Sequence, residues 1–163
     1  MDTNAIHPLP SMAWSDAFLL GYPAMDATHR EFVACVAALQ TAADDDIERC
    51  LSDFLQHALS HFGEEQQWME ASKFPATQCH AEEHDKVLSS VREVIALLQR
   101  GVNKQVARDL AEALVQWFPG HADYMDASLS HWLSQRSHGG ATVVLRRQAT
   151  QPAEQTEKTF PDA

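Results

Sequence analysis

The chain has 163 residues, a formal net charge of −11 at pH 7 and a sequence pI of about 5.1. This length fits one domain, which buries roughly 68–70% of its unfolded surface. Nucleic-acid binding requires a basic surface, so the acidic balance argues against a nucleic-acid partner. No segment reaches about 18 uninterrupted apolar residues, and no basic stretch with a long apolar run opens the chain, so we expect no membrane insertion and no signal peptide.

The number and spacing of the cysteines indicate the redox state of the cellular compartment. Cys35, Cys50 and Cys79 are odd in number and show no CxxC spacing. This pattern fits a reducing compartment better than a disulfide framework, so we expect a cytoplasmic protein. We interpret Cys79, which precedes a histidine, as an ordinary thiol near the core.

The chain begins with an expected N-terminal arm, residues 1–24. Its apolar residues, which we expect to pack across one end of the fold, are Trp14, Phe18, Leu19 and Leu20. Apolar residues then recur every three or four positions, which predicts a first helix over about 25–42. Its core-facing residues are Met25, His29, Phe32, Val36 and Leu39.

The same spacing predicts two further helices, over about 45–71 and 77–100, with Gly101 as the stop of the second. Their core-facing stripes are Ile47, Leu51, Phe54, Ala58, His61, Glu65 and Trp68, and then His80, His84, Val87, Val91, Val94 and Leu98.

A fourth helical segment is predicted over about 103–136. Its stripe is Val106, Leu110, Leu114, Trp117, His121, Met125 and Trp132. Pro119 and Gly120 directly precede His121, and a proline kinks or ends a helix, so we expect a bend or break there. The four segments predict an all-α, up-down-up-down four-helix bundle over 25–136. Residues 137–163, rich in Gly, Pro, Gln and Thr, are predicted to form a flexible, disordered tail.

Seven side chains that bind metals lie on these helices, six of them on the stripes. They are His29, His61 with Glu65, His80 with His84, and His121 with Asp126. Residues four apart share one face of an α-helix, so two of the pairs can each present both ligands to one spot. Unpaired carboxylates in a core cost several kcal/mol, which makes a metal the better explanation. The remaining histidines, assigned to surface or packing roles, are His7, His57, His131 and His138.

The pair His121 and Asp126 is five apart, which in an α-helix rotates the second side chain by about 140° from the first. Two ions about 3.5–4 Å apart relax this demand, because one residue can hold one ion while the carboxylate reaches between them. Five histidines argue against calcium or magnesium, and a single zinc needs only about four ligands.

These motifs resemble the hemerythrin family, specifically its bacterial single-domain branch, over roughly Trp14 to Trp132. The family fingerprint is a lone histidine on the first helix followed by HxxxE, HxxxH and HxxxxD. The chain carries them in that order, as His29 in MDATH and then as HFGEE, HAEEH and HADYMD. A lone HxxxH is common in helices, whereas four linked elements are specific.

The resemblance implies two iron ions (Fe2+/Fe3+) joined by an oxo or hydroxo bridge and by two carboxylates in the bundle core. It implies that one iron is bound by His80, His84 and His121. The other iron is bound by His29 and His61, and Glu65 and Asp126 bind both irons. The bulky residues expected to wall the dioxygen side of the site are Phe32, Phe62, Trp117 and Phe118. Ala122 stands where the family has a larger aliphatic residue, so a thinner wall there would speed autoxidation.

Two functions stay open. The resemblance implies a protein that binds dioxygen reversibly for storage, delivery or sensing, without enzymatic activity, and that has a redox or oxygen-consuming protein as a candidate partner. The alternative is a di-iron enzyme that acts on peroxide or nitric oxide, or that oxidises or donates iron. The histidine-rich set has fewer anionic ligands for high-valent iron than ferritin-like sites, which favours binding over catalysis.

Overall fold

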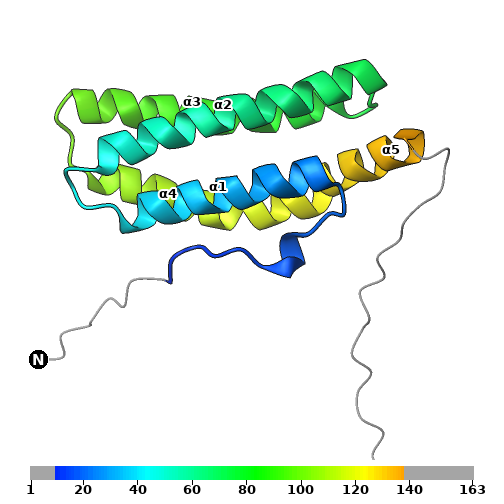
Figure 1. Ribbon diagram of the computed structural model, residues 1–163. Coiled ribbons are helices and arrows are strands. Elements are labelled where there is room, and N and C mark those ends of the chain that lie inside the picture. The colour runs from blue at the N-terminus through cyan, green and yellow to red at the C-terminus, as the bar shows by residue number, and fades with distance from the viewer. Residues whose placement is uncertain (1–9, 138–163) are drawn as a thin grey trace, which may run out of the picture.

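The computed structural model describes residues 10–137 and forms an up-down-up-down four-helix bundle, as predicted (Figure 1). Its elements are η1 (Asp16–Phe18), α1 (Pro23–Thr41), α2 (Ile47–Ser72), α3 (Thr77–Gln99), α4 (Gln105–His121), the π-helical η2 (Ala122–Asp126) and α5 (Ala127–Ser137). Within 10–137, no helix is both long and apolar enough to cross a membrane. The tail predicted over 137–163 lies outside the described residues, except for its first residue, which ends α5.

Two helices end where the backbone turns left-handed. Gly101 has a φ of 81° after α3, and its amide donates to the Leu98 carbonyl at 2.9 Å, which confirms the predicted stop. Lys73 has a φ of 55° after α2, and the next amide, that of Phe74, donates to the Met69 carbonyl at 2.8 Å. These bonds satisfy carbonyls that a helix end leaves open, so short turns can reverse the chain.

A buried carboxylate fixes the start of α1. Asp26 is 4% exposed and accepts the amide N–H groups of Leu20 at 2.7 Å and Gly21 at 3.0 Å. Gly21 has a φ of 81°, which glycine adopts without strain. Pro23 occupies the first helical position, where no amide donor is needed. The chain therefore enters α1 at a defined angle, one turn before His29.

The N-terminal arm runs along the α1–α4 side of the bundle (Figure 1). The Met12 amide donates to Gln40 Oε1 at 2.6 Å, close to the C-terminal end of α1, although the arm joins α1 at its N-terminal end. Trp14 and Phe18 pack against the core, and Phe18 lies edge-on to Phe118 with ring centroids 5.2 Å apart. The prediction that the arm crosses a bundle end was therefore wrong for Trp14 and Phe18, whose rings find apolar partners along the side. Leu20, by contrast, packs against the cluster of Met25, Met69, Leu129 and Leu133.

Pro119 does not break the fourth helix. α4 continues through it, and the helical backbone runs on through η2 and α5 to Ser137. The irregularity lies later, in η2, where the Ala127 amide donates to the Ala122 carbonyl five residues back. The predicted break immediately before His121 was therefore wrong, because a lost amide donor alone does not end a helix packed on its neighbours. The irregularity is a π-helical segment, and it follows His121.

The apolar core divides into two clusters. The larger cluster fills the bundle from Phe32 in α1 to Phe118 and Ala122 in the fourth helix. The smaller one consists of Met25, Met69, Leu129 and Leu133. Predicted core residues that are only partly buried are Trp68, Val106, Trp117, Met125 and Trp132. A layer of buried polar residues lies between the two clusters.

Candidate metal centre

The polar layer contains all seven side chains that the sequence predicts as metal ligands. Every one is buried, with 7% or less of its surface exposed. They come from α1, α2, α3, α4 and η2 and form two groups whose potential ligand atoms lie within 4.8 Å of one another. The groups are Glu65, His80, His84, His121 and Asp126, and His29, His61 and Glu65.

Glu65 presents one oxygen to each group. Its Oε1 lies 2.8 Å from His61 Nε2 and 3.8 Å from His29 Nε2. Its Oε2 lies 3.3 Å from Nε2 of both His80 and His84. A carboxylate in this position can bind two ions, one through each oxygen.

Asp126 has the same divided arrangement. Its Oδ2 lies 3.1 Å from His29 Nε2, whereas its Oδ1 lies 3.0 Å from His80 Nε2 and 3.2 Å from His121 Nε2. His84 Nε2 is 3.1 Å from His121 Nε2, so three imidazoles converge on one side of the two carboxylates. Two imidazoles, those of His29 and His61, converge on the other side, with ring centroids 5.2 Å apart.

His61 with Glu65 and His84 with His121 meet at hydrogen-bond geometry, but several of the other close atoms do not. Both oxygens of Asp126, Oε2 of Glu65 and the Nε2 atoms of His29 and His80 are buried without a hydrogen-bond partner of acceptable geometry. Buried polar atoms are normally paired, so each unpaired one needs an explanation. Lone pairs that point at a common centre are what a metal requires, and the donor set of imidazole and carboxylate fits iron.

The electrostatics describe the same cluster without metal. Burial opposes the charging of His29 and of His80, but close contact with the carboxylates of Asp126 and Glu65 outweighs it and raises the pKa of each imidazole to about 9. Burial likewise raises the pKa of Glu65 and Asp126, yet the surrounding imidazoles hold both values well below their usual range. Positive charge on the imidazoles therefore stabilises the two buried carboxylates, as a bound cation would.

Metal loading is expected to release about two protons per chain near pH 7.5, because His29 and His80 carry protons below their pKa of about 9 and a metal binds neutral imidazole. Since protons compete with the metal, affinity should rise with pH and level off above about 9. Calorimetric titration in two buffers of different ionisation enthalpy measures the released protons. An observed heat that does not depend on the buffer would contradict the assignment, and His131→Ala, at an exposed histidine, serves as the unaltered control.

The π-helical segment explains the five-residue spacing of HADYMD. An α-helix would rotate Asp126 about 140° from His121, but η2 widens the turn by one residue and brings both side chains to one face. The predicted misalignment of this pair was therefore wrong, since it assumed an α-helix. The segment also keeps Leu129 and Leu133 of α5 in the smaller core cluster.

Deletion of Tyr124 is expected to turn η2 into regular α-helix while metal content and thermal midpoint are largely kept. Tyr124 is 79% exposed, and removing the extra residue of a π turn leaves the residues after it in register. Insertion of one alanine after Tyr124 is the matched change, which rotates α5 by about 100° and should lower both quantities. Metal analysis and thermal melting compare the two variants, and equal losses in both would argue against a π turn.

The predicted wall residues cover both groups with rings. Beside His29, Phe118 lies edge-on at 5.2 Å between centroids, and Phe32 stacks on Phe118 at 4.8 Å. On the other side, Phe62 stacks on His84 with centroids 3.8 Å apart and planes 6° apart. Trp117, partly buried, stacks on His121 at 4.2 Å. Ala122 is fully buried in the larger cluster.

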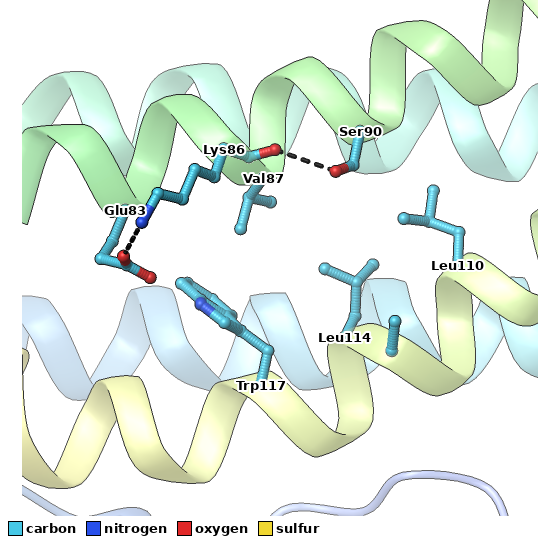
Figure 2. Close-up of a pocket in the computed structure, with 8 residues that line it drawn as sticks. Glu83, Lys86, Val87, Ser90, Leu110, Leu114 and Trp117 are labelled. Atoms are coloured by element: carbon cyan, nitrogen blue, oxygen red, sulfur yellow. Dashed lines mark hydrogen bonds and ion pairs between the residues drawn. The ribbon is translucent and has the colours of Figure 1, made fainter.

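Trp117 also forms one wall of a shallow groove between α3 and α4, opposite Glu83 (Figure 2). Glu83 pairs with Lys86 across one turn of α3, and Lys86 first, then Trp117, lower the pKa of the Glu83 carboxyl. The indole is therefore held between Glu83 and the imidazole of His121.

His57 is a neighbour of the site that the sequence analysis assigned to surface or packing. Its ring lies 5.4 Å from that of His61, and its Nδ1 is 3.6 Å from Glu31 Oε2. Burial, followed by the charges of His61 and His29, lowers the pKa of His57 to about 4. The spacing of four residues from His61 was a signal that could have placed His57 beside the site.

The cysteines and the other histidines lie apart from the seven residues. Cys79 is exposed near the start of α3, so its predicted place near the core was wrong, although it lines a small hollow together with His80. His131 is exposed and pairs with Gln135, whereas His7 and His138 lie outside the described residues.

Comparison with known proteins decides the family. A family model described as "Hemerythrin HHE cation binding domain" matches residues 20–133. The chain belongs to the hemerythrin family. The resemblance drawn from four short motifs is thereby confirmed, and membership implies non-haem iron as the metal of the buried site.

The relatives of this hemerythrin family member come from several bacteria. A bacteriohemerythrin of Ralstonia nicotianae (strain GMI1000) is 40% identical over 128 residues, which cover 78% of this chain and 93% of the relative. Bacteriohemerythrins of Pseudomonas paraeruginosa and Stenotrophomonas maltophilia are 26% and 22% identical, each over 141 residues that cover 79% of this chain and 91% of the relative. The similarity thus spans nearly the whole of each relative.

Proposed function

We propose that the bundle, residues 25–136, holds two iron ions and binds dioxygen reversibly, for storage, delivery or sensing, with residues 1–24 as an accessory arm. The observation that carries the proposal is the division of both carboxylates between the two groups of histidines. Glu65 and Asp126 each direct one oxygen to the first group and the other oxygen to the second, at 2.8–3.3 Å from the nearest imidazole nitrogen atoms. Such a pair of sites fits two ions and does not fit one.

In this assignment the ions have unequal protein ligands. His80, His84 and His121 serve one ion, and His29 and His61 serve the other, with Glu65 and Asp126 shared. The second ion therefore has one protein ligand fewer and can accept a small molecule. When bound, the pair of irons supplies the two electrons that reversible dioxygen binding takes up and returns.

The chain's own residues make the binding reversible. Phe32 and Phe118 are completely or almost completely buried beside His29, so water is kept from the side with the open position. The five imidazoles are neutral once the metals displace their protons, and only two carboxylates balance the metal charge. This shell does not favour high-valent iron, which distinguishes the proposed binding protein from an oxidising enzyme.

The proposal includes a cytoplasmic location and a reducing protein partner that returns oxidised sites to the ferrous form. The three cysteines are free thiols, which supports a reducing compartment.

Stopped-flow absorption spectroscopy of the anaerobically reduced, iron-loaded chain tests the function. Dioxygen should produce a coloured species, and removal of the gas should restore the colourless state over several cycles. Phe118→Ala should admit water and hasten irreversible oxidation without loss of iron, because Phe118 is not a ligand. Immediate oxidation without a coloured species, together with repeated turnover of peroxide or nitric oxide by a supplied reductant, would favour the enzyme instead.

A further inference from the structure

A second groove, between α2 and α3, has one candidate metal ligand, His84, in its lining. It has a volume of about 390 Å³. The residues that line it are Leu59, Phe62, Gly63, Gln66, Ala81, His84, Asp85 and Leu88. Two of them, Phe62 and His84, are almost completely buried, so the groove reaches the layer in which the candidate ligands lie.

Phe62 lines this groove and contacts a histidine of each group of ligands. Its ring stacks on that of His84, in one group, and lies 5.1 Å from that of His61, in the other. A rotation of Phe62 about its side-chain bonds would therefore open the groove toward both groups.

The groove is kept hollow by small residues. Gly63 lies in the interior of α2, where glycine lowers helix stability relative to alanine. Its φ is not positive, and a Cβ added there would meet no atom within 4 Å, so neither backbone conformation nor close packing requires glycine. The missing side chain leaves open space above Phe62, and Ala81 on α3 lines the same space.

A competing groove, between α3 and α4, is smaller and has no candidate metal ligand in its lining. Its volume is about 190 Å³, and its lining includes Trp117, which stacks on His121 and lies beside Glu83 (Figure 2). Across the α2–α3 groove, by contrast, the described lining residues form no ion pair. Gln66, at its rim, bonds along its own helix to Glu70.

We propose that the α2–α3 groove is the access path of a small uncharged ligand to the metal centre, with the Phe62 ring as its gate and Gly63 keeping it clear. The inference deepens the proposed function, on which it rests, by assigning the route and the charge class of the ligand. Asp85 in the lining and the net charge of −11 repel anions, so the path favours uncharged gases of the size of dioxygen.

A variant that fills the groove tests the path. Gly63→Leu should slow both association and dissociation of dioxygen by about tenfold in the iron-loaded chain and leave the equilibrium constant unchanged, since an access path alters the barrier and not the bound state. Gly63→Ala should show a smaller effect in the same direction with a thermal midpoint at least as high as that of the original chain. Ala113→Leu fills the α3–α4 groove instead and should leave both rates unchanged.

Stopped-flow rates with dioxygen and with nitric oxide, and diffraction from xenon-pressurised crystals of the iron-loaded chain, provide the readouts. Xenon should occupy the α2–α3 groove and be displaced in Gly63→Leu. A different result is that xenon occupies the groove and nitric oxide binds more slowly in Gly63→Leu, while dioxygen is not bound reversibly. In that case the proposed function fails and the access path stands. Unchanged rates in Gly63→Leu, or slowing in Ala113→Leu alone, would overturn the path and leave the proposed function intact.

Discussion

Glu65→Ala and Asp126→Ala are each expected to reduce iron content from about two per chain to one or none. Each carboxylate directs its two oxygens to different groups of histidines, so its removal takes a ligand from both ions at once. Removing a partner from a buried charged cluster typically costs about 3–5 kcal/mol, which corresponds to more than a hundredfold in affinity. Elemental analysis after loading with ferrous iron, together with the absorption spectrum, measures the loss.

Asp26→Asn is the matched control, because Asp26 is also a buried carboxylate of the bundle but lies outside both ligand groups. It should retain two irons and an unchanged spectrum. Its thermal midpoint should fall, since the amide replaces a charged acceptor of two backbone N–H groups at the start of α1. If Glu65→Ala or Asp126→Ala keeps two irons and the original spectrum, the bridging assignment is wrong.

Removal of the metal is expected to lower the thermal midpoint of the chain by roughly 10–20 °C. Ligand present at a thousand times its dissociation constant stabilises a fold by about 4 kcal/mol, and each kcal/mol shifts the midpoint of a domain of this size by several degrees. Without metal, two carboxylates and five imidazoles remain buried in the layer between the two core clusters. Calorimetry of loaded and chelated protein measures the difference.

Amide hydrogen exchange should locate the loosened region. The backbone around η2 has the wide π turn and carries Asp126. The exchange rates of its amides should therefore increase most when the metal is removed by a chelator. The helix ends farthest from the site, near Gln99 and Gln105, provide the internal comparison. Equal midpoints with and without metal, or equal protection around η2, would show that binding and folding are not coupled here.

The sequence by itself determined the four helices and the seven residues that meet in the core. Spacing of three and four residues places polar and apolar side chains on one stripe, and such a stripe must be buried wherever the helices pack. His61 and Glu65 follow this rule in α2, and His80 and His84 follow it in α3, so their convergence required no knowledge of the tertiary structure. Gly101 marked the end of α3 for a local reason also, its positive φ.

Other features were decided only by the tertiary structure. The five-residue step from His121 to Asp126 does not say whether the backbone is α- or π-helical, because that choice depends on keeping α4 and α5 packed on different core clusters at the same time. The course of the arm depends on partners such as Phe118, which lie about 100 residues away in sequence. The access groove likewise exists only where two helices pack side by side. The sequence shows Gly63 as an isolated glycine in a helix, and only the packing of α2 on α3 places it beside Ala81 in the groove lining.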